Sequence, residues 1–139
     1  MTVGSPVTTR LGSDLIKAVQ ARATRARRSR SELIAELIRV GLDVLRYAGI
    51  TFVEGPAGLR AHVAGTGLDV WEVVMVHRAH KEAEEATLKH LQQLSRRQLR
   101  TGLTYYQDHR REIEAILAEQ ARAPEKWAQE VAVSRPIRT

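Results

Sequence analysis

The chain has 139 residues, a formal net charge of +6 at pH 7 and no cysteine. This length suffices for one domain or two small ones, and the missing cysteines exclude disulfides and thiolate metal sites. No apolar run approaches the ~20 residues of a membrane span, and the first residues lack the apolar core of a signal peptide. We therefore expect a cytoplasmic protein without a membrane partner.

The positive charge is concentrated in the first third of the chain. Residues 1–46 hold nine Lys or Arg against four Asp or Glu, whereas residues 47–139 hold thirteen against twelve. A basic excess on one segment is typical of a nucleic-acid contact, although a solvated basic surface has the same composition. Its place beside the predicted elements described next favours contact with phosphate.

A short strand is predicted near the N-terminus. Val7, Thr9 and Leu11 alternate onto one face, and Thr8 and Arg10 onto the other. No matching strand follows before the helices, so we expect the same strand of a second copy to complete the ladder. The result is an antiparallel ribbon in a homodimer or a higher even-numbered oligomer. Such a ribbon fits the major groove of double-stranded DNA.

Two amphipathic helices are predicted after the strand. The first begins near Ser13, its expected N-cap, with Asp14 in the first turn. The second has Ser29 as its expected N-cap and Glu32 as the partner in a capping box. The apolar residues of the second helix cover more surface than one neighbour needs; they are Leu33, Ile34, Leu37, Ile38, Leu42 and Leu45. This wide surface also predicts a dimer.

The predicted domains are 1–48 for dimerisation and DNA binding, 49–122 for a helical domain with a small β-hairpin, and 123–139 for a tail. The hairpin is indicated by two runs rich in β-forming residues, 50–53 and 59–64. The residues between these runs are typical of a turn.

The helical part of the second domain is indicated by caps and spacing. Asp69 is the expected cap of a helix that follows a tight turn at residues 65–67. Residues 81–93 are polar and rich in Ala, Glu and Leu, and Leu88 and Leu91 are the expected buried pair. Ser95 is the expected cap of one long helix that ends at Pro124, because proline lacks the N–H that a helix interior needs.

The first third of the chain resembles a known family of DNA-binding proteins. The motif residues are Thr8-x-Arg10-Leu11, Leu15 and Ser29-Arg30-Ser31-Glu32-Leu33-Ile34. They resemble the ribbon-helix-helix family of CopG, MetJ and Arc-type repressors. The resemblance implies that Thr8 and Arg10 contact bases. It also implies that Ser29, Arg30 and Ser31 hold a phosphate, as a helix N-terminus does, with the adjacent Arg28 as a further candidate.

The second part of the chain resembles another family. Its motif residues are Gly58-x-Arg60, Ala64-Gly65-Thr66-x-x-Asp69-Val70-Trp71-x-Val73, Leu94-Ser95-x-x-Gln98-Leu99 and Leu103-x-Tyr105-Tyr106-x-x-His109-x-x-Glu112-Ile113. They resemble the small helix-turn-helix-class domain of VapB-like antitoxins. The domain is encoded in that family beside a PIN-like nuclease toxin, which implies a PIN-like toxin protein as a partner.

Two further groups of side chains are candidates for contacts. Arg96, Arg97 and Arg100 follow the Ser95 cap and are candidates for a second DNA or partner contact, although the balanced charge of this half favours protein. Of the adjacent Tyr105 and Tyr106, we expect one in the core and the other at its rim.

Catalysis and metal binding have little support in the sequence. His77, His80 and Glu84 share a helix face, but zinc sites need three or four convergent ligands with further hydrogen-bonded support. A solvated helix face is the better interpretation, so we expect no metal and no cofactor. No nucleophile with a base is apparent either, and we expect no enzyme.

The expected fold is mainly α, with a ribbon-helix-helix dimer followed by a small β-hairpin and a helix-turn-helix-like domain. The expected function is a sequence-specific DNA-binding repressor associated with the nucleoid. It would be the autoregulating antitoxin of a type II toxin–antitoxin system. The alternative is a plain transcription factor or nucleoid-associated protein whose C-terminal domain mediates oligomerisation.

Overall fold

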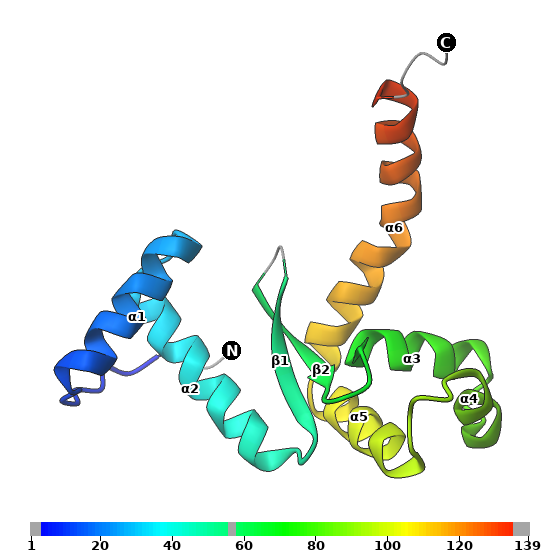
Figure 1. Ribbon diagram of the computed structural model, residues 1–139, viewed down its shortest axis with the longest axis horizontal. Helices are drawn as coiled ribbons and strands as arrows, with labels where there is room; N and C mark the ends of the chain where they lie inside the picture. The colour runs from blue at the N-terminus through cyan, green and yellow to red at the C-terminus, as the bar shows by residue number, and fades with distance from the viewer. Residues whose placement is uncertain (1–3, 56–57, 135–139) are drawn as a thin grey trace. The chain divides into compact units, whose positions relative to one another are not determined.

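The computed structural model describes residues 4–55 and 58–134, with side chains up to Arg122. The chain divides into two compact units, unit 1 (residues 1–43) and unit 2 (residues 44–139). The described residues form six helices and a small three-stranded antiparallel sheet, so the protein is mainly helical, as predicted (Figure 1). None of these helices is long and apolar enough to cross a membrane.

Unit 1 is built on α1 (Ser13–Ala26) and the greater part of α2 (Arg30–Arg46). The N-cap of α1 is Gly12 rather than Ser13, one residue before the predicted position. α1 ends at Arg27, whose left-handed backbone (φ 53°) lets its N–H reach the carbonyls of Ala23 and Thr24. Ser29 caps α2 as predicted, because its hydroxyl accepts the N–H of Glu32 at 3.1 Å.

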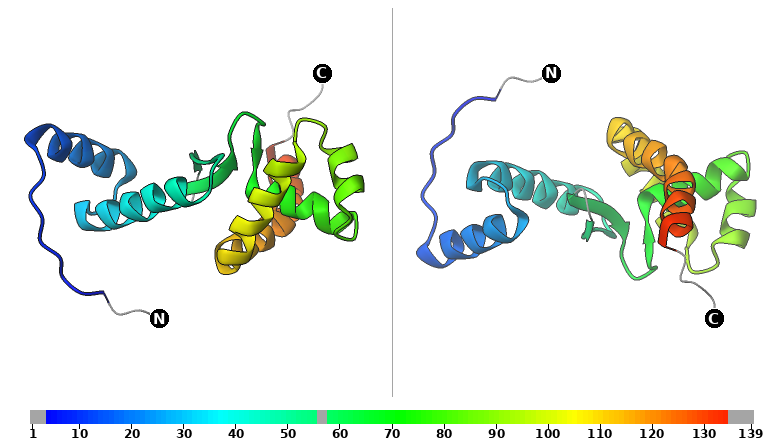
Figure 2. Two further views of the ribbon diagram at one scale, coloured as in Figure 1. Left: turned by 90° about the horizontal axis from the view of Figure 1, so that it is seen from below. Right: turned by 90° about the horizontal axis from the view of Figure 1, so that it is seen from above.

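The segment before α1, Gly4–Gly12, has no regular secondary structure and is almost fully exposed. Figure 2 draws it as a plain trace that leads into α1. A strand needs a partner for its ladder hydrogen bonds, and the partner expected here belongs to a second copy. The predicted ribbon-helix-helix arrangement therefore stays a prediction.

The sheet of unit 2 contains the predicted hairpin and one further strand. β1 (Ile50–Gly55) pairs antiparallel with β2 (Gly58–Val63), which places Ile50 opposite Val63. The predicted hairpin is confirmed. The expected tight turn follows at Gly65 (φ +79°) and Gly67 (φ +73°), after which Leu68–Asp69 pairs with β2 as β3. A strand of two residues is too short to show the alternation of apolar and polar residues from which strands are predicted.

Four helices complete unit 2: α3 (Val70–Ala79), α4 (Glu84–His90), α5 (Arg96–Asp108) and α6 (Arg110–Ser134). Asp69 and Ser95 cap α3 and α5 as predicted, and in both cases the side chain of the third helical residue accepts the backbone N–H of the cap. Within the polar segment 81–93 only residues 84–90 are helical, and of the expected buried pair Leu91 is buried and Leu88 is half-buried. Lys81 and Glu82 have left-handed backbones (φ 54° and 60°), which end α3 and delay α4.

Two predictions about the last helices are wrong. The helix after Ser95 is not continuous, because His109 (φ −129°, ψ 40°) separates α5 from α6. That break turns both Tyr105 and Ile113 into the core, where each is 1% exposed. Pro124 does not end the helix either, because the backbone of α6 continues to Ser134. Proline removes one helical hydrogen bond, but the residues around it are mostly strong helix formers.

The two units have separate cores. In unit 1 the buried residues are Val19, Ala23 and Leu33. In unit 2 the core lies where α3 packs against α5, α6 and the sheet, and its most deeply buried side chains include Val63, Val70, Val73, Leu99, Tyr105 and Ile113.

Candidate nucleic-acid interface

The two residues expected to contact bases lie in the exposed segment before α1. Thr8 and Arg10 are both exposed, and their neighbour Val7 is 87% exposed. No ion pair holds Arg10 among the residues that the structure describes. The segment therefore leaves both side chains available to a ligand. Whether they read base edges stays a prediction.

The candidates at the start of α2 are in three different situations. Arg28 donates a hydrogen bond to Glu36 and lies 3.8 Å from the carboxylate of Glu32, so its charge is already paired. The bond to Glu36 raises the pKa of the Arg28 guanidinium. The hydroxyl of Ser29 is occupied by the helix cap. Of these four candidates, Arg30 and Ser31 are exposed and have no ion pair or side-chain hydrogen bond with another described residue.

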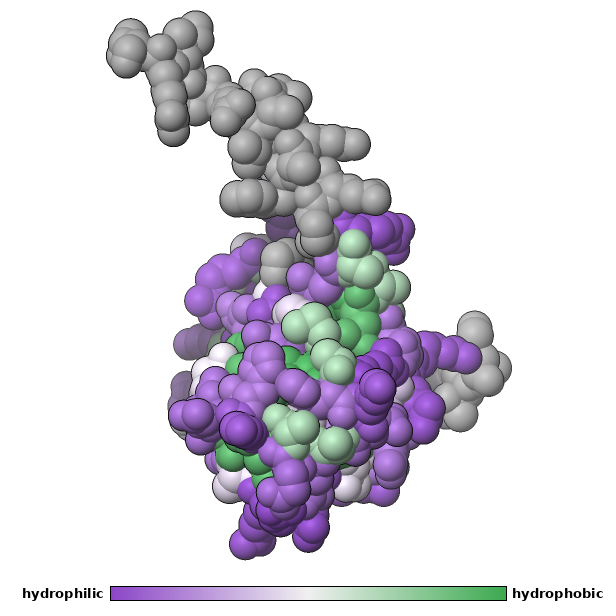
Figure 3. Space-filling view, turned by 90° about the vertical axis from the view of Figure 1, so that its right-hand side faces the viewer, coloured by the Kyte–Doolittle hydropathy of each residue, from purple (hydrophilic) through white to green (hydrophobic). Residues whose placement is uncertain are grey.

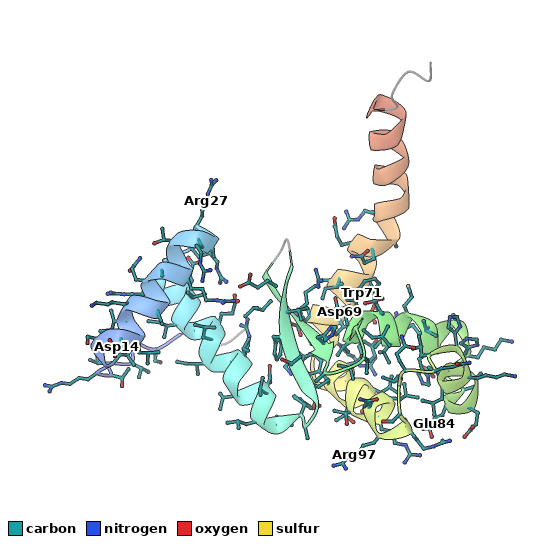
Figure 4. All side chains as sticks on the ribbon, in the orientation of Figure 1. Asp14, Arg27, Asp69, Trp71, Glu84 and Arg97 are labelled. Carbon is teal, nitrogen blue, oxygen red and sulfur yellow. The ribbon has the colours of Figure 1, made fainter. Side chains whose placement is uncertain are left out.

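The three arginines at the start of α5 also differ from one another. Arg100 donates to Glu84 through Nε (3.2 Å) and Nη2 (3.0 Å), and Arg96 donates to both Glu84 and Glu85. The hydrogen bonds from Arg100 and Arg96 lower the pKa of Glu84. Arg97 has no carboxylate partner among the described residues, and Figure 4 shows its side chain pointing outward.

A hollow of about 520 Å³ in unit 2 gathers these arginines with the end of α2. Its lining consists of Arg46, Tyr47, Ala48, Arg96, Arg97, Arg100, Thr101 and Thr104. Tyr47 fixes one wall, because its buried ring packs edge-on against Tyr105 and its hydroxyl donates to Asp108 at 2.5 Å. The end of α2 thereby places Arg46 beside the arginines of α5.

A second hollow, of about 260 Å³, adjoins the first. The two share Ala48, Arg97 and Thr101 in their linings, and the second adds Gly49, Val63 and Gln98. We call the two hollows together the arginine groove. Arg97 lies where they meet. The sequence named Arg96, Arg97 and Arg100 but did not indicate that Arg46 would join them, because that meeting depends on the packing of Tyr47.

The sequence indicated Asp69 only as a helix cap and did not predict the side chains that its carboxylate binds. The buried Asp69 carboxylate accepts hydrogen bonds from Arg60 Nε (2.9 Å), His62 Nδ1 (2.8 Å) and Trp71 Nε1 (3.0 Å). Figure 4 labels Asp69 and Trp71. Burial alone would raise the pKa of Asp69. The hydrogen bonds from His62 and Trp71 and the charge of Arg60 outweigh burial and lower this pKa. The cluster fastens β2 to the start of α3.

The histidines considered for a metal do not converge with Glu84. His77 is buried and its Nδ1 lies 2.8 Å from the hydroxyl of Thr87. That hydroxyl donates its proton to the carbonyl of Ala83, so His77 must be the donor to Thr87. His80 instead contacts His90 at 2.9 Å. No group of three potential ligands that could hold a metal occurs among the described residues.

The paired tyrosines are placed as predicted. Tyr105 is buried in the core, and its hydroxyl donates to Glu112 at 2.7 Å. Tyr106 is half-buried at the rim, where it contacts Arg78 and Glu114.

The outer face on the α4 side of unit 2 is mostly hydrophilic with small apolar groups (Figure 3).

Comparison of the chain with protein-family models, curated proteins and solved structures finds no match.

Proposed function

We propose that this protein is a homodimeric, sequence-specific DNA-binding repressor. The observation that carries the proposal is a row of apolar side chains on α2 that face solvent in the single chain. Ile38, Leu42 and Leu45 are 59%, 63% and 85% exposed and follow one another at helical spacing. A contiguous row of large apolar residues on a small, charged unit favours burial against another protein surface. A second copy of α2 is the simplest such surface.

Dimer formation would also complete the segment before α1. Residues 4–12 have exposed backbone and carry Thr8 and Arg10 at alternate positions. Pairing with the same segment of a second copy satisfies the backbone groups and presents two copies of Arg10 on one face. Arginine is the side chain best suited to a bidentate contact with guanine. The exposed Arg30 and Ser31 are then free to contact the DNA backbone.

The proposal includes the role of an autoregulating antitoxin that binds a PIN-like nuclease through unit 2. Its support is the resemblance at the motif residues, several of which lie in or beside the cluster around Asp69. Arg60 and Trp71 both donate hydrogen bonds to Asp69 there. This cluster stabilises the fold and identifies no toxin-contacting side chain. Recovery of a PIN-like protein with the tagged chain from host extract tests this part. If unit 2 only mediates oligomerisation, no such protein will be recovered.

A pair of substitutions in unit 1 tests DNA recognition. The duplex is one selected from a random pool by the wild-type chain, and a scrambled duplex is the control. Arg10→Ala should lower affinity for the selected duplex by about 1–3 kcal/mol per contact and leave binding to the scrambled duplex largely intact. Arg30→Ala should weaken binding to both duplexes alike and reduce the salt dependence of the affinity by roughly one counterion per contact. Equal weakening of both duplexes by Arg10→Ala would refute the assignment of Arg10 as a base reader.

A further inference from the structure

The arginine groove is a concave surface whose charged side chains are all positive. Four arginines line it, from the end of α2 and the start of α5, and none of its lining residues is Asp or Glu. The lining also contains apolar groups, but all of its charged side chains are arginines. Several guanidinium groups without a carboxylate match a ligand that carries several phosphates along its length.

The charge that remains available in the groove is centred on Arg97. Glu84 and Glu85 occupy Arg96 and Arg100, but Arg97 has no competing carboxylate among the described residues. An anion can therefore bind Arg97 without breaking an ion pair.

Two neighbouring arginines can join Arg97 at little cost. Arg46 lies 3.7 Å from Asp108 and is 70% exposed, and Arg100 is 65% exposed. Exposed ion pairs of this kind contribute only about 0.2–1 kcal/mol, so a phosphate can compete for either arginine.

The N–H groups of Ser95 and Gln98 are occupied by the helix cap. Ser95 accepts the N–H of Gln98, and the side chain of Gln98 accepts the N–H of Ser95, at 3.1 and 2.8 Å. The arginine side chains of the groove are the contacts that single substitutions can test.

We propose that the arginine groove binds the phosphodiester backbone of duplex DNA, with Arg97 as the principal contact. This inference rests on the proposed function, because it adds a second DNA-binding surface to a protein whose first surface lies in unit 1. Backbone contacts carry no sequence information, so the groove adds affinity for all duplexes rather than specificity. It also explains why three arginines cluster in a unit whose total charge is almost balanced.

The test uses the full chain with Arg97→Ala, Arg97→Lys and Arg111→Ala. Arg111 is an exposed arginine of α6 outside the linings of the groove, so it controls for the loss of one charge. Arg97→Ala should lower the affinity for the selected and the scrambled duplex alike, by roughly tenfold per protomer, because a hydrogen bond to a charged group is lost. It should also reduce the salt slope by about one counterion per protomer.

The control variants should behave differently. Arg97→Lys should retain most of the affinity and the salt slope, because the charge stays. Arg111→Ala should change affinity by less than about twofold, as expected for a distant charge that salt screens. Thermal unfolding should be unchanged in all three variants, because both arginines are exposed.

The outcomes separate this inference from the proposed function. If Arg97→Ala binds both duplexes as the wild type does, or no more weakly than Arg111→Ala, the groove is not a DNA site, while Arg10→Ala and Arg30→Ala still decide the function. If inorganic phosphate binds and Arg97→Ala abolishes that binding without affecting DNA, the ligand is a free anion and the inference is overturned. If the wild type binds no duplex at any salt concentration, both the proposed function and this inference fail.

Discussion

The two units differ most in how much of their apolar surface they bury by themselves. Unit 2 encloses thirteen buried hydrophobic residues in one cluster, whereas unit 1 buries three. Removing apolar surface from water is the main favourable contribution to folding. Unit 1, whose three buried residues include the small Ala23, gains much less of it by itself than unit 2 does.

The exposed residues lead to the same distinction. Ile38 and Leu42 of unit 1 are exposed on α2, although their spacing is that of a buried helix face. Unit 2 instead fixes its polar groups internally, as the Asp69 cluster shows. Unit 2 therefore encloses a large core of its own, whereas the proposed dimer would supply the second protein surface that covers the exposed apolar residues of unit 1. The predictions below test that difference, from the largest expected effect to the smallest.

Leu42→Ala should break the dimer. The side chain is 63% exposed in the single chain, so the monomer loses little, but a dimer interface contains it twice. Truncation of a buried leucine costs about 2–5 kcal/mol per copy, so the dissociation constant should rise by about a thousandfold or more. Sedimentation at micromolar concentration should then show monomers.

The matched control for this prediction is Met75→Ala, which truncates a 47% exposed apolar residue of unit 2. It should leave the sedimentation of the dimer unchanged. If Leu42→Ala sediments as the wild type does, unit 1 does not dimerise through α2 and the distinction between the units is wrong.

Asp69→Ala should destabilise unit 2 by about 3 kcal/mol. The substitution leaves Arg60, His62 and Trp71 without their common acceptor, and removal of one partner from a buried charged pair typically costs about 3–5 kcal/mol. We choose the lower end because the Arg60 side chain is 29% exposed. Urea unfolding followed by tryptophan fluorescence measures the effect, since Trp71 lies in the cluster. Dimerisation should be unaffected, and its loss would show that the two units are coupled.

Acid should lower the stability of unit 2 by protonating the Asp69 carboxylate. This effect should be smaller than that of Asp69→Ala. The pKa of Asp69 is lower in the folded protein than its usual value of about 3.9. The folded state therefore binds the proton more weakly than the unfolded state. The resulting stability is fully present above pH 3.9 and is lost as the pH falls through the folded pKa. The difference in urea midpoint between wild type and Asp69→Asn should shrink over that range. A difference that is constant down to pH 2 would contradict this.

The two serine caps should give the smallest effects, and each should affect its own unit. Ser29→Ala and Ser95→Ala each remove a cap hydrogen bond of 3.1 Å, which costs about 1 kcal/mol. Ser29→Ala should lower the temperature of an unfolding transition that depends on protein concentration, because the proposed dimer couples the folding of unit 1 to association. Ser95→Ala should lower the temperature of an unfolding transition that does not depend on protein concentration. Calorimetry at several concentrations measures both, and glycine at each position should cost only a few tenths of a kcal/mol.

Much of the local structure could be predicted from the sequence because it depends on short-range chemistry. The caps at Ser29, Asp69 and Ser95 use bonds between residues three apart, which a sequence displays directly. The hairpin of β1 and β2 follows from β-forming runs on either side of turn residues. Helix ends set by backbone angles were less predictable, since neither the left-handed Lys81 nor the break at His109 has a distinctive residue type.

The sequence by itself determined which residues carry charge, which segments are amphipathic and which residues cap α2, α3 and α5. Only the tertiary structure decided which charges remain available. Arg96, Arg97 and Arg100 are equivalent in the sequence, but the packing of α4 beside α5 pairs two of them with Glu84 and leaves Arg97 unpaired by any described residue. The physical reason is that ion pairing and burial depend on distances between elements remote in the chain, whereas helix periodicity and capping depend only on neighbouring residues.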